Sequence, residues 1–420
     1  MKGTMSSSIQ ATWRRTFDPL SVPNLRLFFA GQSVSLVGTW LQSTAQALLV
    51  YRLSGGRSEP VAITACCTAV PLILLGPLLG SLTSHIARRH LVIATQCVEL
   101  ALAAILGFLV HAGRATPASV YILAFLLGCA EAIYFPAVQR LLRDIAGSTH
   151  IRSAVGLNAV ISNIARFGGP TLAGLLIGSF GISIAFFLNS LSFLAVIISL
   201  LLLHEEQERP LEQPERWSFR KTTQHLLEDA HLLGVFAIIG LMNVFGQSCY
   251  ALIPALKAGD ARATGLLLGA AGLGSLISAL CVMPFFQGFR RPGLLLCGAL
   301  LWMGCALAVT ASLHSLSLQL VSMVCVGLAT TVLFVTTVGL LQTVPPLPAH
   351  GALFGLFSAS FYGSQPIAAL GLAYLADRGS TARTMQESAL VEVSGALLLL
   401  LLPQWRSWDL SRQSVPEPAA

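Results

Sequence analysis

The chain has 420 residues, of which 55% are hydrophobic and only 10% are charged. A soluble globular domain carries about 25% charged residues, so this sequence cannot cover a water-facing surface. Disorder is excluded as well, because it requires low hydrophobicity and high net charge. The net charge of +7 comes without a basic stretch interleaved with aromatic residues, which argues against nucleic-acid binding. The composition therefore indicates a polytopic membrane protein embedded in a lipid bilayer.

Twelve apolar segments are long enough for a helix to cross a bilayer, which takes about 20 residues. A β-barrel is disfavoured because its strands alternate in polarity and span about 10 residues. The last segment is short and contains Glu392, so we expect that side chain near a membrane edge. The predicted helices are 25–50, 61–83, 91–111, 118–140, 154–178, 183–203, 231–256, 264–286, 293–313, 317–343, 352–376 and 388–404.

The largest polar interruption divides these segments into two sets of six. Seventeen Lys and Arg residues fall on the side of the N-terminus and seven on the other side. Positive charge gathers on the inside of a membrane, so both termini are expected in the cytoplasm. Two parallel six-helix halves form the repeat of the major facilitator fold. The predicted parts are a cytoplasmic segment at 1–24, bundles at 25–203 and 231–404, a cytoplasmic linker at 204–230 and a tail at 405–420.

The first and fifth segments carry the motifs of a known family. Asn24–Gln32 and Gly38-Thr-Trp-Leu-Gln42 resemble the first helix of bacterial major facilitator exporters, in the branch of enterobactin exporters and macrolide efflux proteins. Asn163-Ile-Ala-Arg166 and Gly169-Pro170 resemble the fifth helix of that branch, including its antiporter motif. The resemblance implies a monomeric transporter of the bacterial inner membrane that exports a siderophore or related metabolite by proton antiport. A multidrug or macrolide efflux pump is the alternative.

Residues of the transport gate are implied by the same resemblance. After its second helix the family usually reads Gly-x-Leu-Ala-Asp-Arg, whereas this chain has Gly80-Ser-Leu-Thr-Ser84-His85. The acidic latch residue is thus replaced by Ser84, and we expect rearranged gating contacts. A transport-inactive membrane sensor or adaptor therefore stays open as a further alternative. The gating candidates are Gly80, Ser84, Arg88, Arg89, Gly169 and Pro170.

Four ionisable side chains fall well inside the predicted spans: Glu99, Glu131, Arg166 and Glu392. A charge near the bilayer centre costs about 2.5–3.5 kcal/mol, so such residues usually face the bundle interior. Glu131 and Arg166 lie at similar depths in consecutive spans and can pair. The pair is either a structural ion pair or a proton-coupling device that opens when Glu131 is protonated. We expect Glu99 to be buried and hydrogen-bonded to Gln96 or to another helix, with proton coupling as the alternative.

Seven polar or aromatic side chains on the first, fourth, seventh and tenth spans are candidates for the wall of a substrate cavity. For each of them the alternative is a hydrogen bond between helices. The sequence shows no nucleophile–base set, no P-loop and no metal-ligand spacing among its nine cysteines. We therefore expect neither enzymatic activity, nor a cofactor, nor a metal. The cavity candidates are Gln42, Gln46, Tyr134, Asn243, Gln247, Tyr250 and Gln342.

Overall fold

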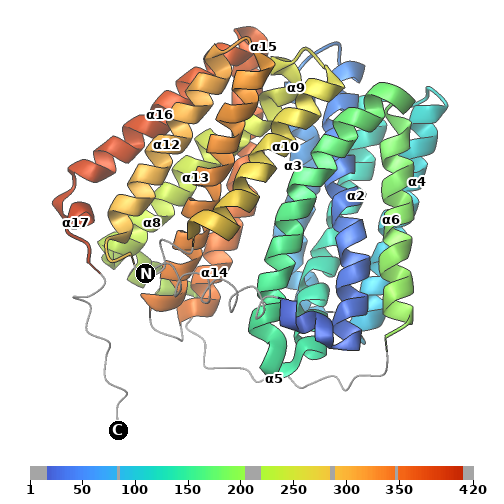
Figure 1. Ribbon diagram of the computed structural model, residues 1–420, viewed down its shortest axis with the longest axis horizontal. Coiled ribbons are helices and arrows are strands. Elements are labelled where there is room, and N and C mark those ends of the chain that lie inside the picture. The colour runs from blue at the N-terminus through green and yellow to red at the C-terminus, as the bar shows by residue number, and fades with distance from the viewer. Residues whose placement is uncertain (1–16, 83–85, 204–218, 284–288, 346–348, 410–420) are drawn as a thin grey trace, which may run out of the picture. The chain divides into compact units, whose positions relative to one another are not determined.

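The computed structural model describes residues 17–82, 86–203, 219–283, 289–345 and 349–409, and in these ranges its regular elements are helices (Figure 1). Nine helices of the described residues are long and apolar enough to cross a membrane. The predicted all-α, multi-pass architecture is confirmed. The number of twelve spans stays a prediction.

The chain divides into two compact units, each described separately below. Unit 1 consists of Met1–Leu211 and Lys257–Gly272, and unit 2 consists of Glu212–Leu256 and Leu273–Ala420. The predicted bundles had their limits at 25–203 and 231–404, so the grouping of Lys257–Gly272 with unit 1 was not expected. The predicted division into bundles otherwise stays a prediction.

Unit 1 begins with helices whose first residues favour helix entry. Proline stands at the first position of α2 and of α5, where the missing N–H costs nothing. Thr116 and Ser119 form a reciprocal capping box at the start of α5. Gly147, with φ 61°, interrupts α5 and separates the predicted fourth and fifth spans. The elements are η1 (Asp18–Ser21), α2 (Pro23–Leu53), α3 (Glu59–Leu82), α4 (Arg88–His111), α5 (Pro117–Phe180), α6 (Ser183–Leu201) and the first part of α10 (Ala261–Ile277).

Small residues let the helices of unit 1 approach closely. Helix α2 packs against α5 and α6, and α4 packs against α6 and α5 (Figure 1). Gly31 of α2 lies against Ser199 of α6, and Gly38 of α2 lies against Ser192 and Asn189 of the same helix. A Cβ atom at either glycine would overlap these neighbours. Close approach of this kind is how helices associate where lipid removes the hydrophobic driving force.

Unit 2 contains a span that changes its helix type. After α8 (Ala230–Leu241) the backbone continues as a π-helix and then as a 3-10 helix before α9. Short π segments within α-helices often occur at functional sites. The elements are α7 (Phe219–Glu228), α8, η3 (Met242–Gly246), η4 (Gln247–Leu252), α9 (Ile253–Leu256), η5 (Ser278–Val282), α12 (Pro292–Ser312), α13 (Leu316–Thr343), α14 (His350–Ser358), η7 (Ala359–Gly363), α15 (Ser364–Arg378), α16 (Thr381–Leu401) and α17 (Pro403–Arg406).

The last predicted span starts earlier in the structure than in the sequence analysis. Helix α16 begins at Thr381 rather than at residue 388. Its first turns are polar, and Arg383 and Glu387 form an i,i+4 ion pair there at 2.8 Å. Hydropathy alone misses such a segment, although ion pairs at this spacing support a helix. Glu392 therefore lies near the middle of the helix rather than near its start, and its expected position near a membrane edge stays a prediction.

The short C-terminal helix α17 is anchored in unit 2 by Trp405. This side chain is 1% exposed and packs on Gly234 of α8 and on Gly293 of α12. A Cβ atom at either glycine would collide with the indole, so both positions require a residue without a side chain. Helix α17 is thus held on unit 2 by one buried side chain, while its other residues are exposed.

We predict that Trp405→Ala lowers the free energy of unfolding by about 3 kcal/mol, because it empties a buried site that its glycine neighbours cannot refill. The measurement is thermal or denaturant unfolding of the purified protein in detergent. Trp302→Ala is the matched control, since Trp302 is 56% exposed. Equal losses for the two variants would contradict the anchoring role of Trp405.

Candidate functional site

A cluster of polar side chains lies inside unit 1, and we call it the unit 1 carboxyl cluster. Gln96 Nε2 of α4 donates to Glu99 Oε2 at 2.9 Å, and both residues are at most 5% exposed. Gln32 of α2 and the hydroxyl of Tyr134 of α5 are hydrogen-bonded at 3.0 Å. Glu131, half-buried on α5, completes the cluster. The expected hydrogen bond between Glu99 and Gln96 is confirmed.

Helix α4 brings Glu99 into the interior because its buried residues recur every three or four positions. Val92, Gln96, Glu99, Ala103 and Leu106 form this buried face, which is the pattern of a helix packed on one side. The side chain thus occupies a position that an apolar residue would fill in an ordinary membrane helix. A carboxyl at such a place is a marker of function.

The two carboxyls of the cluster influence each other. Glu99 and Glu131 are within electrostatic range, and their like charges repel. Glu99 Oε1 and Gln96 Oε1 are buried without a hydrogen-bond partner. Charging both carboxyls at once is therefore unfavourable, and protons bind to such a pair as a coupled system. Chemically, the cluster can hold and release a proton in an apolar surround.

Arg166 contacts an aromatic ring of unit 1. Its guanidinium carbon lies 5.0 Å from the ring centroid of Trp40 on α2, within the range of a cation–π interaction. Trp40 was not among the predicted site residues, although it stands in the Gly38–Gln42 motif. The ion pair between Glu131 and Arg166 stays a prediction.

Two cavity candidates make hydrogen bonds between helices. The amide of Asn189 on α6 donates to Gln42 Oε1 at 2.8 Å, with both side chains buried. Gln247 Nε2 donates to Thr330 Oγ1 of α13 at 3.1 Å. These contacts match the alternative given for the cavity candidates in the sequence analysis. Their contact with a substrate stays a prediction.

The other cavity candidates differ in exposure. Gln46 is 9% exposed on α2, and Asn243, 1% exposed, donates to the carbonyl of Ile239 in its own helix. Tyr250 is half-buried in the 3-10 segment η4. Gln342 is exposed close to the C-terminal end of α13. The broken segment of unit 2 thus carries three of the seven candidates.

Among the gating candidates, the two arginines after the second span have defined partners. Arg88 forms an ion pair with Asp144 of α5. Arg89 donates to the carbonyls of Leu201 and Leu203 at 3.0 and 3.3 Å, where a cation satisfies the exposed acceptors at the end of α6. Asp144 was missed in the sequence analysis, because its contact with Arg88 depends on how α4 and α5 pack.

The remaining gating candidates lie in α3 and α5. Gly80 belongs to α3, and Ser84 lies outside the described residues. Gly169 packs on Trp40 and Leu41 of α2, and the carbonyl of Pro170 faces Gly265 of α10. These contacts place the antiporter-like motif against two neighbouring helices of unit 1.

The turn before α10 is tied to the end of α2. Arg52 Nη2 donates to the carbonyl of Gly259 at 2.9 Å, and Asp260 caps α10 by accepting from the amides of Arg262 and Ala263. Burial lowers the pKa of the Lys257 ammonium, while the Asp260 carboxylate acts in the opposite direction. Arg52 thus holds the turn from α2, and Asp260 holds it to the start of α10.

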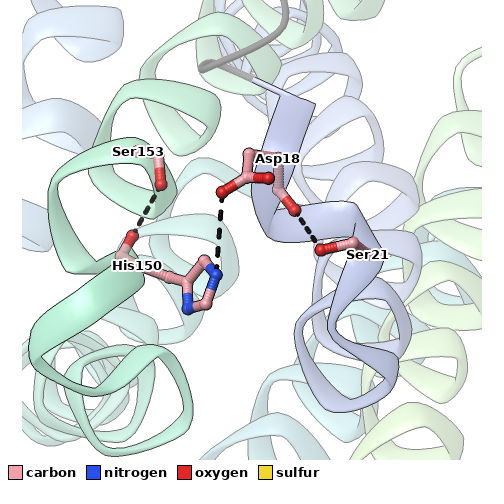
Figure 2. A network of polar contacts seen from close by, with 4 residues as sticks. All are labelled: Asp18, Ser21, His150 and Ser153. Carbon is pink, nitrogen blue, oxygen red and sulfur yellow. Dashed lines mark hydrogen bonds and ion pairs between the residues drawn. The ribbon is translucent and has the colours of Figure 1, made fainter.

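A further polar network joins the first described residues to α5. Figure 2 shows His150 Nε2 and Asp18 Oδ2 facing each other at 3.6 Å, an ion pair when the imidazole is protonated. Ser21 and Ser153 donate to the carbonyls of Asp18 and His150, respectively. This contact fixes η1 beside α5 and was not foreseen in the sequence analysis.

The described residues contain no group of three or more His, Cys, Asp or Glu that could hold a metal ion. The helices long enough to cross a membrane, taken together with the comparisons with known proteins, identify a multi-pass membrane transporter rather than an enzyme. The chain belongs to the transmembrane secretion effector family of the major facilitator superfamily, whose model matches residues 14–420.

Individual relatives are distant. The uncharacterized transporter YfiS of Bacillus subtilis is 23% identical over 357 residues, which cover 80% of this chain and 82% of that protein. The staphyloferrin A transporter of Staphylococcus aureus is 25% identical over 61% of this chain and 64% of its own. Multidrug resistance protein 1 of Bacillus subtilis is 23% identical over 65% and 67%, respectively.

Solved structures share the fold. A crystal structure of a point mutant of the nucleoside transporter NupG superimposes with a TM-score of 0.69, covering 90% of this chain and 97% of that one at 11% sequence identity. The predicted major facilitator fold is confirmed by this likeness and by the family match.

We predict that Gln42 acts as a packing residue between α2 and α6. Gln42→Leu strands the buried amide of Asn189 and should lower the free energy of unfolding by about 1–3 kcal/mol. Gln42→Leu combined with Asn189→Leu should recover most of this loss, since both polar partners are then removed together. Unfolding of the purified variants in detergent measures both effects.

The control is Asn163→Leu, because Asn163 donates only locally, to Ala159 of its own helix. A stable Gln42→Leu variant with a changed substrate KM would contradict the packing role and favour contact with the substrate.

Proposed function

We propose that this chain is a secondary active transporter that exports a small molecule in exchange for protons, by alternating access. The observation that carries the proposal is the unit 1 carboxyl cluster, in which Glu99 is bonded to Gln96 and lies within electrostatic range of Glu131. A carboxyl in an apolar surround is far less stable when charged than when neutral. Its protonation can therefore be linked to a change of conformation.

In this proposal Glu131 is the carboxyl that exchanges its proton during transport. It is half-buried, whereas Glu99 is 5% exposed and already bonded to Gln96. Repulsion from Glu99 favours the protonated form of the pair, and the cation of Arg166 favours the ionised form of Glu131 when the two approach. Arg166 then switches between the carboxylate and the face of Trp40.

The gate consists of contacts on α4, α5 and α10. Arg88 and Asp144 latch α4 to α5, and Pro170 and Gly174 lie against Gly265. Close backbone contact without side chains permits small sliding motions of packed helices. The proline and glycines at 169–174 are thus suited to a surface that slides and seals in turn.

The first substrate class is a siderophore or a related secreted metabolite. The family description of transmembrane secretion effectors and the likeness to a staphyloferrin A transporter support export of such a molecule. An amphipathic drug is the second candidate, supported by the likeness to a multidrug resistance protein. The charge asymmetry of the loops supports a bacterial inner membrane location with both termini in the cytoplasm.

The proposal is tested with everted membrane vesicles, in which an exporter accumulates its substrate. We expect uptake of a candidate siderophore, or of a fluorescent drug, only when a proton gradient is present. Gradient-dependent uptake of either compound also separates the two substrate classes. Absence of uptake from well-folded protein would contradict export and favour the sensor or adaptor.

We predict that Glu131→Gln keeps substrate binding but reduces transport driven by a pH gradient to the background level, because the amide cannot exchange a proton. Binding to the purified protein and gradient-driven uptake are measured side by side. The control is Glu387→Gln, an exposed carboxyl paired with Arg383. Normal transport by the Glu131 variant would assign coupling to another group.

We predict further that Glu131→Arg combined with Arg166→Glu folds better than either single variant, because two like charges near each other inside a membrane are costly. Expression level and the melting temperature in detergent measure this rescue. If the double variant is no more stable than the worse single variant, the two side chains do not pair.

A further inference from the structure

Unit 2 contains a buried carboxyl of its own, Glu392. Its helix α16 packs against the segment Met242–Leu252, in which the α-helix changes to a π-helix and then to a 3-10 helix. Glu392 is 0% exposed and lies near the middle of α16 (Thr381–Leu401). With a rise of about 1.5 Å per residue, either end of the helix is about 15 Å away. The carboxyl thus lies in the apolar part of α16, past its polar first turns.

The surroundings of Glu392 come from the segment in which α8 gives way to the π-helix η3. A Cβ atom built on Gly246, the last residue of η3, would lie 3.0 Å from Glu392 Oε1. Met303 of α12 approaches the same glycine. The absence of a side chain at Gly246 therefore leaves room for the Glu392 carboxyl.

The carbonyl of Phe245, in the π-helix η3, accepts side-chain hydrogen bonds, one of which comes from α16. Ser388, one turn before Glu392, donates to the carbonyl of Phe245 at 2.8 Å. Cys249 Sγ donates to the same carbonyl at 3.0 Å. These donors satisfy Phe245 and do not reach Glu392. Any change in the helix type of this segment must alter the contacts around the carboxyl.

Neither oxygen of Glu392 has a hydrogen-bond partner among the described residues. No Asp, Glu, Lys, Arg or His occurs in α12, α13, η3 or η4. The charged groups on elements packed against α16 stand near helix ends: His231 of α8, Asp377 and Arg378 of α15, Arg406 of α17, and Arg383 and Glu387 of α16 itself. The thiols and phenols on these elements are Cys249 and Tyr250 of η4, Cys297 and Cys305 of α12, and Tyr374 of α15. Of these, Cys249 interacts electrostatically with Glu392.

An ionised carboxylate at this place would be both unsolvated and unpaired, which is far too costly for a stable fold. Even the neutral acid forgoes a hydrogen bond, worth about 1–3 kcal/mol when a buried group is left unsatisfied. A leucine would fill the site at lower cost. A carboxyl that stabilises nothing in the described conformation is explained by a second conformation that supplies donors or water.

We propose that Glu392 is a proton-binding site of unit 2, loaded in the described conformation and unloaded when the segment Met242–Leu252 rearranges. The step is a plain proton transfer: a carboxylate oxygen takes a proton from water and later returns it to water. The inference deepens the proposed proton coupling and rests on it. It adds a second proton site, in a different unit from the Glu99–Glu131 cluster.

The test is infrared difference spectroscopy of the purified full-length protein between mildly acidic and mildly alkaline buffer, without substrate. The carboxylic acid C=O band reports the neutral acid directly. Among the bands of buried acids that wild type loses as the pH rises, we expect one that Glu392→Gln lacks, while the bands of Glu99 and Glu131 are common to both proteins. Glu387→Gln should retain the Glu392 band, because Glu387 is an exposed carboxyl on the same helix.

Glu392→Asp is a second variant for the case that Glu392→Gln does not fold. It keeps the carboxyl, and a shift of the C=O band in this variant assigns the band to residue 392. A Glu392 band that persists at every pH would overturn the proposal and leave a purely structural acid. Absence of any acid band from Glu392 would overturn it as well, since the site would then be ionised throughout. The measurement does not depend on uptake, so a failure of gradient-driven export in vesicles is detected separately.

Discussion

A hydrocarbon surround makes every buried polar side chain depend on partners that the protein itself supplies. Most polar residues inside the two units meet this requirement. Asn189 is paired with Gln42, Gln247 with Thr330, and Gln32 with Tyr134. Such pairs hold helices at a fixed register and explain why few of the polar residues need a role in transport. The exceptions among the described residues are therefore informative.

The ionisable exceptions are two carboxyls, Glu99 and Glu392, and each has a distinct environment. Glu99 keeps one oxygen bonded to Gln96 and lies within electrostatic range of Glu131, so its titration belongs to a group. Glu392 has neither a hydrogen-bond partner nor a carboxyl neighbour, and it faces a span whose helix type changes. In the proposed mechanism the first environment ties protonation of Glu99 to the charge of Glu131, and the second ties protonation of Glu392 to the backbone geometry of Met242–Leu252.

The multi-pass architecture and most helix limits could be predicted because membrane helices are apolar over a length set by the bilayer. The start of α16 could not, since its polar first turns are helical for local reasons that hydropathy does not measure. The error had a consequence for Glu392, which lies near the middle of α16 and not near its start. An error of two turns in a helix limit is thus enough to misplace a side chain along its helix.

Contacts between residues distant in sequence could not be predicted either. The hydrogen bond of Glu99 was predictable because Gln96 lies one helical turn away. Asp144 opposite Arg88 and Trp40 beneath Arg166 depend on how helices pack, which no local pattern contains. The break in the seventh span was equally hidden, because Met242–Leu252 contains no proline and nothing in these residues marks a change of helix type.

Two proton sites in different units would change the energetics of export and not only its mechanism. One proton moving down a gradient of one pH unit supplies about 1.4 kcal/mol, which is a tenfold concentration ratio for the substrate. Two protons per substrate double that free energy and square the ratio to about a hundredfold. A transporter that secretes a molecule against its own accumulation outside the cell gains from the steeper limit.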